Sequence, residues 1–315
     1  MFGCLGCARI AVEARVTGGQ SVTMPVIAIA GSTGQVALAL MRQATGRKVR
    51  ALCAGRPQLD LADAASIEAF LDDARPNIVI NAAAYTAVDK AEGEPQLART
   101  VNAEGPATLA CGCAKLNIPL IQISTDYVFD GTKTSPYLED DAIAPLSVYG
   151  RTKADGEEAV RHLSPKHLIV RTSWVYGPDG ANFLKTMLRL AAERDEVGVV
   201  GDQHGAPTRA DDLAAALLDV SETLINSTNE TRWGTYHLAG GGQTTWHGFA
   251  SKIFEHAAAK GLKIPRLRQI ATQEYPTPAR RPAYSVLDQA KIGKSFGVRM
   301  PDWSDSLARH FANLP

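Results

Sequence analysis

The sequence predicts an α/β fold with a doubly wound parallel sheet, followed by a smaller C-terminal α/β lobe. Short β-rich runs alternate with helical stretches of roughly 10 to 20 residues from Val26 onward, which is the pattern of successive βαβ units. A glycine-rich turn that begins at Gly31 directly follows the first of these runs. Beyond about Gly177 the alternation loosens, and helices are separated by loops that contain glycine and proline. These features place the sheet in the first part of the chain and the lobe after it.

Five apolar runs are predicted to form strands, at Val26–Ala30, Lys48–Cys53, Asn77–Asn81, Pro119–Ser124 and His167–Thr172. Helical patterns stand between and after them. We expect helices from the glycine turn to about Thr45 and at Ser66–Ala74, Pro95–Leu116, Ser147–His162, Phe183–Glu193, Asp211–Leu224 and Trp246–Ala259. Because parallel strands joined by right-handed crossovers end at the same edge of a sheet, we expect a ligand at their carboxyl ends.

The composition excludes several classes of protein. The chain carries 33 Lys and Arg against 33 Asp and Glu, and this zero formal charge argues against a nucleic-acid or anionic-membrane partner. The five cysteines are too few, and odd in number, for a disulfide framework, and Cys4-x-x-Cys7 has no second pair at zinc spacing. Glycines interrupt the longest uncharged run, between Arg15 and Arg42, so no membrane span is predicted. We expect a cytoplasmic globular protein with no metal site.

The turn Gly31-Ser-Thr-Gly34-Gln-Val-Ala37 follows the first strand and opens the first helix. Gly31 permits a tight turn, Gly34 allows the backbone to approach a pyrophosphate, and Ala37 keeps the helix close to the sheet. The phosphates would then lie on free N–H groups at the positive end of the helix dipole. The spacing GxxGxxA therefore predicts a dinucleotide-binding loop.

The end of the second predicted strand indicates which dinucleotide is bound. NAD-binding proteins tend to place an acid there for the ribose 2′-hydroxyl, whereas this chain has Leu52-Cys53-Ala54-Gly55-Arg56, with no carboxylate and one arginine. A guanidinium suits a 2′-phosphate, which favours NADPH over NADH while leaving NADH possible. The alternative is that Arg56 is a solvated loop residue. Asp60, the next acid, is expected near the adenine.

These features divide the chain into three parts. Residues 1–24 have no clear periodicity and precede the first strand, so we expect a disordered extension or a start site assigned too early. Residues 25–177 are expected to form an NADP-binding Rossmann domain. Residues 178–315 are expected to be mainly a substrate-binding lobe, with some segments returning to the Rossmann sheet.

Tyr149-Gly-Arg-Thr-Lys153 places a phenol and an ammonium on one face of a helix, at positions i and i+4. A cation beside Tyr149 would lower the phenol pKa from about 10 and make it a usable acid or base. Thr125 closes the fourth strand, where its hydroxyl can bond a substrate carbonyl. The combination with the glycine turn predicts carbonyl or alcohol redox chemistry.

The chain resembles the extended short-chain dehydrogenases/reductases, and within them a branch that reduces sugar nucleotides. The resemblance covers about residues 25 to 305. The segments that carry it are Gly31–Val36 (GSTGQV), Asn81–Glu92 (NAAAYTAVDKAE), Ser124–Gly131 (STDYVFDG), Pro145–Lys153 (PLSVYGRTK), Arg171–Gly177 (RTSWVYG), Asp202–Thr208 (DQHGAPT) and Tyr275–Asp288 around PTPARRP.

The resemblance implies roles for individual residues. Thr125, Tyr149 and Lys153 would be the catalytic set, Thr125 and Asp126 would face the substrate, and Trp174 would pack on it. Asn102 would support the lysine through water. The residues implied to contact the cofactor, from pyrophosphate to nicotinamide, are Gly31, Gly34, Gln35, Val36, Asp60, Leu61, Ala82, Ala83, Ala84, Tyr149 and Lys153.

The resemblance also implies a reaction. Hydride would pass from C4 of NADPH to the C4 ketone of a dTDP-linked 6-deoxy-4-ketohexose, giving dTDP-L-rhamnose for cell-envelope polysaccharide. Tyr149 would give its proton to the nascent alkoxide, Thr125 would hold that oxygen, and Lys153 would grip the nicotinamide ribose. No metal is needed for this step.

Two other functions are weighed against reduction. Related dehydratases carry Thr-Asp-Glu where this chain has Thr125-Asp126-Tyr127, and Tyr127 removes the base that would take a C5 proton. Asp126 could alternatively be a cap at the strand end. Members of the family also serve as non-catalytic NADP-binding regulatory subunits of methionine adenosyltransferase, which the presence of Tyr149 and Lys153 alone does not exclude. Another nucleotide-sugar 4-ketoreductase is also possible.

The chain departs from the family pattern at three positions. Ala37 replaces the glycine that is more usual, and Tyr284 stands where asparagine is common. Ala39 occupies the position at which some relatives dimerise through a carboxylate-bound metal, so a monomer or another homodimer stays open.

Other residues allow a structural interpretation as well as a functional one. His204 could touch the sugar or be a satisfied loop histidine, and Arg280 and Arg281 could contact a diphosphate or form a surface pair. Trp246 and Phe249, at i and i+3, are expected in the core.

Overall fold

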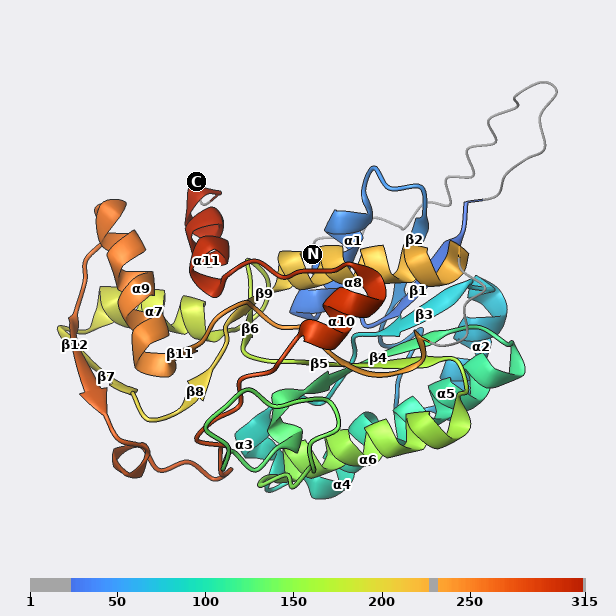
Figure 1. The fold of residues 1–315 in the computed structure, drawn as a ribbon, viewed down its shortest axis with the longest axis horizontal. Helices are drawn as coiled ribbons and strands as arrows, with labels where there is room; N and C mark the ends of the chain where they lie inside the picture. The colour runs from blue at the N-terminus through green and yellow to red at the C-terminus, as the bar shows by residue number, and fades with distance from the viewer. Residues whose placement is uncertain (1–23, 227–231, 314–315) are drawn as a thin grey trace, which may run out of the picture.

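A central parallel sheet of six strands organises the computed structural model, which describes residues 24–226 and 232–313 (Figure 1). The strand order is β10-β5-β4-β3-β1-β2, and every neighbouring pair is parallel. The strands are β1 (Val26–Ala30), β2 (Arg50–Ala54), β3 (Ile78–Asn81), β4 (Leu120–Thr125), β5 (His167–Thr172) and β10 (Gly234–His237). The predicted doubly wound sheet is confirmed. The sixth strand, β10, was not predicted.

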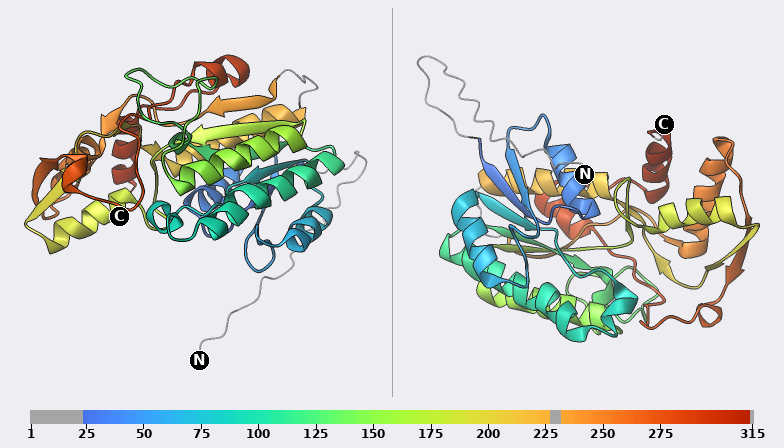
Figure 2. Two further views of the ribbon diagram at one scale, coloured as in Figure 1. Left: turned by 90° about the horizontal axis from the view of Figure 1, so that it is seen from below. Right: turned by 180° about the vertical axis from the view of Figure 1, so that it is seen from behind.

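Alternate residues of the strands serve two hydrophobic cores, one on each face of the sheet. Ile27 and Ile29 of β1 pack with helices α1 (Gln35–Ala44) and α8 (Ala210–Asn226). Ala28 and Ala30 of the same strand pack on the opposite face. That face is covered by α2 (Ala64–Ala74), α5 (Gly105–Lys115) and α6 (Val148–Leu163), as the two further views show (Figure 2). Because both faces are covered, the strands read as continuous apolar runs rather than alternating ones.

The predicted helix Pro95–Leu116 contains a π-helical turn. It consists of α4 (Pro95–Arg99), a π-helical turn η1 (Thr100–Glu104) and α5. A side chain at Gly156 of α6 would collide with the carbonyl of Asn102 in this turn, so the two elements approach very closely. An extra residue in a helical turn bulges the backbone without changing the hydrophobic period enough to be noticed in a sequence. The helix predicted at Pro95–Leu116 is therefore present, with a π-helical turn at Thr100–Glu104 that was not predicted.

The C-terminal lobe has its own core, formed mainly by α7 (Phe183–Glu193), α9 (Trp246–Ala259) and α11 (Trp303–Ala312). The parallel strands β7 (Glu196–Val200) and β12 (Arg266–Ile270) pack against α9. α7 and α9 lie at the predicted residues. The remaining elements, which are short except for α10, are α3 (Val88–Ala91), η2 (Asp126–Val128), β6 (Val175–Tyr176), β8 (His204–Gly205), β9 (Thr208–Arg209), β11 (Thr244–Thr245), η4 (Thr272–Glu274) and α10 (Ala290–Phe296).

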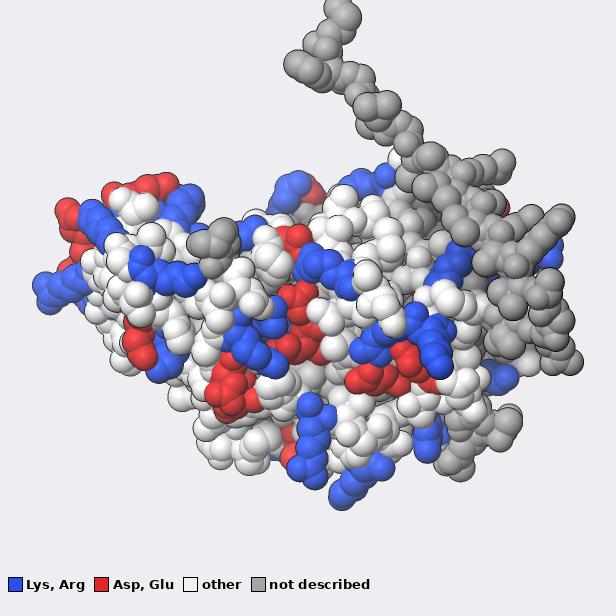
Figure 3. Space-filling model, turned by 90° about the horizontal axis from the view of Figure 1, so that it is seen from above, with Lys and Arg blue, Asp and Glu red and all other residues white. Residues whose placement is uncertain are grey.

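Charged side chains of both signs are interspersed on the face that carries α1 and α8 (Figure 3). Arg47 on this face pairs with Asp219 and Glu222 of α8. No helix in the described ranges has both the length and the hydropathy that a membrane crossing requires. The extension predicted at residues 1–24, with Cys4 and Cys7, lies outside the described residues except for Met24.

Candidate active site

The glycine turn after β1 leaves room for a ligand's phosphates. Gly31 has a φ of +115° and donates from its backbone N to the carbonyl of Ala54 at 2.7 Å. A Cβ there would lie 3.3 Å from the backbone N of Ala83, so both conformation and space favour glycine. Gly34 caps α1 without any side-chain hydrogen bond. The first N–H groups of α1 are therefore available at the positive end of the helix dipole.

Gln35 and Val36 follow this turn and differ in what they contact. The amide of Gln35 donates to the carbonyl of Val175 at 3.4 Å and accepts from Asn182 Nδ2 at 3.0 Å. Its side chain thus links α1 to the C-terminal lobe. The side chain of Val36 packs against the core beneath α1. A cofactor phosphate at this position would therefore meet backbone rather than side-chain groups of Gln35 and Val36.

Arg56 follows β2 next to the glycine turn. Gly55 packs so closely on Ser32 of that turn that any side chain there would collide with it. The Arg56 side chain is exposed, and within residues 24–226 and 232–313 it has no ion-pair partner. Its guanidinium is thus a free cation beside the end of β1, which fits a 2′-phosphate.

Asp60 and Leu61 lie in the loop after Arg56. The carboxylate of Asp60 accepts from the backbone N of Ala62 at 3.0 Å, so it shapes its own turn. Leu61 is buried, and its carbonyl would lie 2.6 Å from a Cβ at Gly105. The loop is thereby packed tightly on the start of α5.

Ala82, Ala83 and Ala84 follow β3 and are half-buried. The backbone N of Ala82 donates to the carbonyl of Ala30 at 2.9 Å, and that of Ala83 to Asn81 Oδ1 at 3.2 Å. Three small side chains therefore stand beside the glycine turn, where bulkier ones would reduce the space for a planar ring.

Tyr149 and Lys153 lie on the first turns of α6, which Ser147 caps by accepting from the backbone N of Gly150 at 3.1 Å. The ammonium of Lys153 is buried and donates to the carbonyl of Ile123 in β4 at 2.6 Å. Burial lowers the pKa of Lys153 to about 8, although the Glu157 carboxylate opposes this.

The phenol of Tyr149 is not acidified in this structure. Its pKa is raised to about 12, chiefly because of burial, with the Asp126 carboxylate adding to the rise and the Thr125 hydroxyl opposing it. The expected lowering of the Tyr149 pKa by Lys153 is therefore wrong here. At neutral pH the phenol keeps its proton, which is the form needed to protonate an alkoxide.

Thr125 and Asp126 form a hydrogen-bonded pair at the end of β4. Thr125 Oγ1 donates to Asp126 Oδ1 at 3.0 Å and accepts from the backbone N of Tyr127 at 3.1 Å. The Asp126 carboxyl is 2 % exposed, and burial raises its pKa to about 7. Among the described residues its Oδ2 has no hydrogen-bond partner. A buried oxygen without a partner is available to a ligand hydroxyl.

Trp174 has a φ of +45° and lies at the junction of the two lobes. Its ring stacks on Trp246 with centroids 3.5 Å apart. Trp246 is half-buried and also contacts Phe183, so it belongs to an aromatic cluster between the lobes as well as to the edge of the core. Phe249 is fully buried, which confirms that prediction.

The two consecutive arginines have different surroundings in the structure. Arg281 forms an ion pair with Asp89 at 2.7 Å, whereas Arg280 is exposed. His204 is exposed and bonds through its backbone to the segment that follows Arg281. The hydroxyl of Tyr284, which stands where asparagine is common, donates to Gln243 Oε1 at 3.0 Å.

Sequence reasoning missed a buried ion pair between Glu157 of α6 and Arg171 of β5. Glu157 accepts from Arg171 Nε at 2.9 Å and from its terminal nitrogen at 2.7 Å, and from Ser124 Oγ at 2.6 Å. These bonds join α6 to β4 and β5. Glu157 continues the face of Tyr149 and Lys153 at i+8 and i+4, and this spacing was the available signal.

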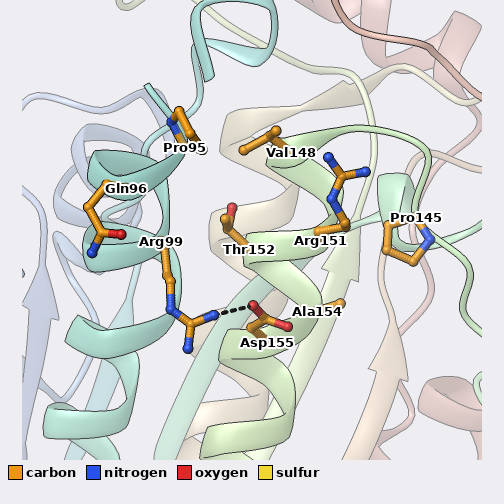
Figure 4. A pocket seen from close by; sticks show the side chains of 9 residues that line it. All are labelled: Pro95, Gln96, Arg99, Pro145, Val148, Arg151, Thr152, Ala154 and Asp155. Atoms are coloured by element: carbon orange, nitrogen blue, oxygen red, sulfur yellow. Dashed lines mark hydrogen bonds and ion pairs between the residues drawn. The ribbon is translucent and has the colours of Figure 1, made fainter. Parts of the chain in front are cut away.

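A hollow of about 540 Å³ lies on another side of α6 (Figure 4). It is bordered by Pro95 and Arg99 of α4 and by Arg151 and Asp155 of α6, and Arg99 pairs with Asp155 across it at 2.9 Å. None of the predicted catalytic or cofactor residues borders it. The hollow is thus separate from the candidate site.

Comparisons with known proteins agree on one family. The family model described as "RmlD substrate binding domain" matches residues 24–315. A dTDP-4-dehydrorhamnose reductase of Sinorhizobium fredii is 46% identical over 284 residues, covering 90% of this chain and 95% of that protein. The Escherichia coli K12 enzyme of the same name is 46% identical over 242 residues, covering 76% and 80%.

Solved structures give the same result. The dTDP-4-dehydrorhamnose reductase of Bacillus anthracis in complex with NADP superimposes with a TM-score of 0.86 at 34% identity, covering 93% of this chain and all of that one. The Clostridium acetobutylicum protein gives 0.84 at 39% identity, covering 91% and 98%.

Proposed function

The chain belongs to the RmlD family, whose relatives described above are dTDP-4-dehydrorhamnose reductases, and we propose that it reduces the C4 ketone of dTDP-4-dehydro-6-deoxy-L-mannose with NADPH. The product is dTDP-L-rhamnose. The chain is an NAD(P)-dependent oxidoreductase of the extended short-chain type. NADPH is preferred over NADH because Arg56 is free to meet a 2′-phosphate.

One observation carries the assignment of the chemistry. A protonated phenol, a hydroxyl and an ammonium gather around the end of β4: the Thr125 hydroxyl lies close enough to Tyr149 to oppose the rise in its pKa, and Lys153 bonds the backbone of Ile123, two residues before Thr125. The open turn at Gly31 lies at the same edge of the parallel sheet. This is the set needed for reducing a carbonyl beside a dinucleotide.

The residues present fit the pyrophosphate and the nicotinamide side of the cofactor. A side chain at position 31 would crowd the strand end after β3, and the uncapped start of α1 supplies donors for a pyrophosphate. Ala82, Ala83 and Ala84 leave space for the nicotinamide side, and Lys153, whose ammonium donates to the carbonyl of Ile123, would bond the ribose hydroxyls. When bound, the reduced nicotinamide supplies the hydride.

Side chains of the protein then donate the proton and bind the substrate. Tyr149 transfers its phenolic proton to the oxygen that forms at C4, and the Thr125 hydroxyl turns from Asp126 Oδ1 to donate to the same oxygen. Asp126 Oδ2 accepts a hydroxyl of the sugar, since it is buried without a partner in the described chain. Trp174 supports the sugar with its ring at the junction of the lobes. We divide the chain accordingly into a cofactor-binding part, residues 25–177, and a mainly substrate-binding part, residues 178–315.

Dehydration is disfavoured by the same geometry. Tyr127 occupies the position of the dehydratase glutamate, and its ring stands edge-on to Tyr149 with centroids 5.9 Å apart. Burial raises the pKa of the Tyr127 phenol, so at neutral pH it keeps its proton and cannot accept one from C5.

Steady-state oxidation of NADPH by the purified chain with the dTDP-4-keto sugar tests the proposal. We expect turnover, and a loss of at least about a hundredfold in Tyr149→Phe, because that variant lacks the proton donor. A regulatory subunit would bind NADPH and show no turnover. Gel filtration of the same sample decides between monomer and homodimer, and the expected location is the cytoplasm.

A further inference from the structure

The segment 277–288, here called the strap, joins the two lobes beside the candidate site. Its backbone exchanges hydrogen bonds with His204 of β8: His204 N donates to Ala283 at 2.8 Å and Ser285 N donates back at 2.8 Å. Tyr137 makes a similar exchange with Val286 and Asp288, at 2.8 Å each. The strap is thus bonded to the C-terminal lobe at one point and to the loop after β4 at another.

The strap packs directly on the residues that follow Thr125. A Cβ at Gly131, whose φ is +78°, would lie 2.6 Å from atoms of Pro282 and Ala283. The hydroxyl of Ser285 lies close enough to the Asp126 carboxyl to oppose the rise in its pKa. Two sequence segments that are far apart, around Asp126 and around Arg281, therefore form one packed unit.

Arg281 fastens the strap to the sheet domain. Its terminal nitrogens contact both carboxylate oxygens of Asp89 in α3, at 2.7 and 3.1 Å. One of them also bonds Thr277 Oγ1 at 2.5 Å and the carbonyl of Ala279 at 3.1 Å. The planar fork of a guanidinium matches the two oxygens of one carboxylate, whereas an ammonium binds them as a point charge. The side chain is 21% exposed, so these bonds are partly shielded from water.

The Arg281 guanidinium is linked to the phenol of Tyr149 through the ring of Tyr127. The hydroxyl of Tyr127 interacts with Arg281, and the ring of Tyr127 meets Tyr149 edge-on, at an interplanar angle of 80°. Edge-to-face pairs have a preferred geometry, so holding one ring constrains the other. A line of contacts runs from Asp89 through Arg281 and Tyr127 to Tyr149.

We propose that Arg281 is a positioning residue for the reduction: anchored on Asp89, it holds the strap and the Tyr127 ring so that the Tyr149 hydroxyl stays aligned with the ketone. This inference rests on the proposed function. It differs from the alternative in which Arg281 binds the substrate diphosphate, because a guanidinium engaged with Asp89 would have to leave that carboxylate first.

The variants Arg281→Met, Asp89→Asn and the double variant test this. Arg47→Met is the matched control, because Arg47 is 23% exposed, bonds two acids and two carbonyls, and lies in the turn after α1, away from the site. We expect Arg281→Met and Asp89→Asn each to lower kcat by roughly 10- to 100-fold, the cost of misplacing reacting groups by about 1 Å. The double variant should lose no more than either single variant, since both break one contact.

Two further readouts separate positioning from a general loss of stability. KM for NADPH should stay within about twofold, and Arg281→Lys should recover part of kcat because an ammonium still pairs with Asp89. Hydrogen exchange should rise in peptides covering 277–288 and 125–131 in Arg281→Met, and not in Arg47→Met.

An Arg281→Met variant with unchanged kcat, or with a fall in kcat equal to that of Arg47→Met, overturns the inference. A rise in KM for the sugar nucleotide with kcat unchanged would assign Arg281 to the diphosphate instead, and would also overturn it. An inactive wild-type chain would refute the proposed function itself, while the exchange measurement would still show whether Arg281 holds the strap.

Discussion

Replacing Arg171 with methionine should destabilise the protein more than any surface ion-pair variant. The Arg171 side chain is 2% exposed and that of its partner Glu157 is fully buried. The change removes two charge-assisted bonds to Glu157, at 2.9 and 2.7 Å, and one to the carbonyl of Glu139, at 3.2 Å. Glu157 would keep Ser124 and Arg161 as partners.

The size of the expected destabilisation depends on the partners that Glu157 keeps. Breaking a buried pair by removing one partner costs about 3–5 kcal/mol, and because Arg161 still neutralises Glu157 we expect about 3 kcal/mol. Part of this loss should recover at acidic pH, because Glu157 without Arg171 is more easily protonated when buried.

Urea unfolding followed by circular dichroism measures this free energy, and Arg189→Met is the control because Arg189 and Glu193 form an exposed pair on α7. The control should leave the midpoint nearly unchanged. A loss below about 1 kcal/mol in Arg171→Met would refute the reasoning that this pair is buried and essential to the packing of α6.

Two further predictions concern the site. Asp126→Asn should stabilise the fold more at about pH 8 than at about pH 5, by about 3 kcal/mol, because burial raises the folded-state pKa of Asp126 to about 7. The stabilisation from its protonation is lost as pH rises to about 7, and the two pKa units between pH 5 and pH 7 are worth about 1.4 kcal/mol each. Urea titrations at both pH values check this, and an equal change at both would contradict it. Arg56→Ala should raise KM for NADPH roughly 10- to 100-fold and leave KM for NADH unchanged, since only NADPH carries the 2′-phosphate. Equal effects on both cofactors would place Arg56 away from that phosphate.

The local features of the site were predictable from the sequence because neighbouring residues determine them. Gly31 was identified by its place between a strand and a helix, and the structure gives it the positive φ that only glycine adopts freely. The helix that carries Tyr149 and Lys153 was expected at Ser147–His162, and the structure has it at Val148–Leu163 with Ser147 as its cap. These elements need no information about distant contacts.

Features made by distant contacts could not be predicted in the same way. Arg281 and Asp89 are 192 positions apart, and no periodicity links them. The burial of Tyr149 could not be predicted either. The expectation that Lys153 lowers the pKa of Tyr149 considered the lysine charge alone, whereas desolvation of the phenol has the largest effect and raises its pKa. The π-helical turn at Asn102 depends on the close approach of Gly156, which only the packed structure shows.

The most direct test of the central claim follows the hydride itself. The chain is incubated with the dTDP-4-keto sugar and NADPH that carries deuterium on the transferring face of its C4 position, and the sugar product is analysed by NMR. We predict one deuterium at C4 of the sugar and none elsewhere, with the transfer lost in Tyr149→Phe. Product that lacks deuterium at C4, or transfer that persists at the wild-type rate without the Tyr149 hydroxyl, would contradict the account.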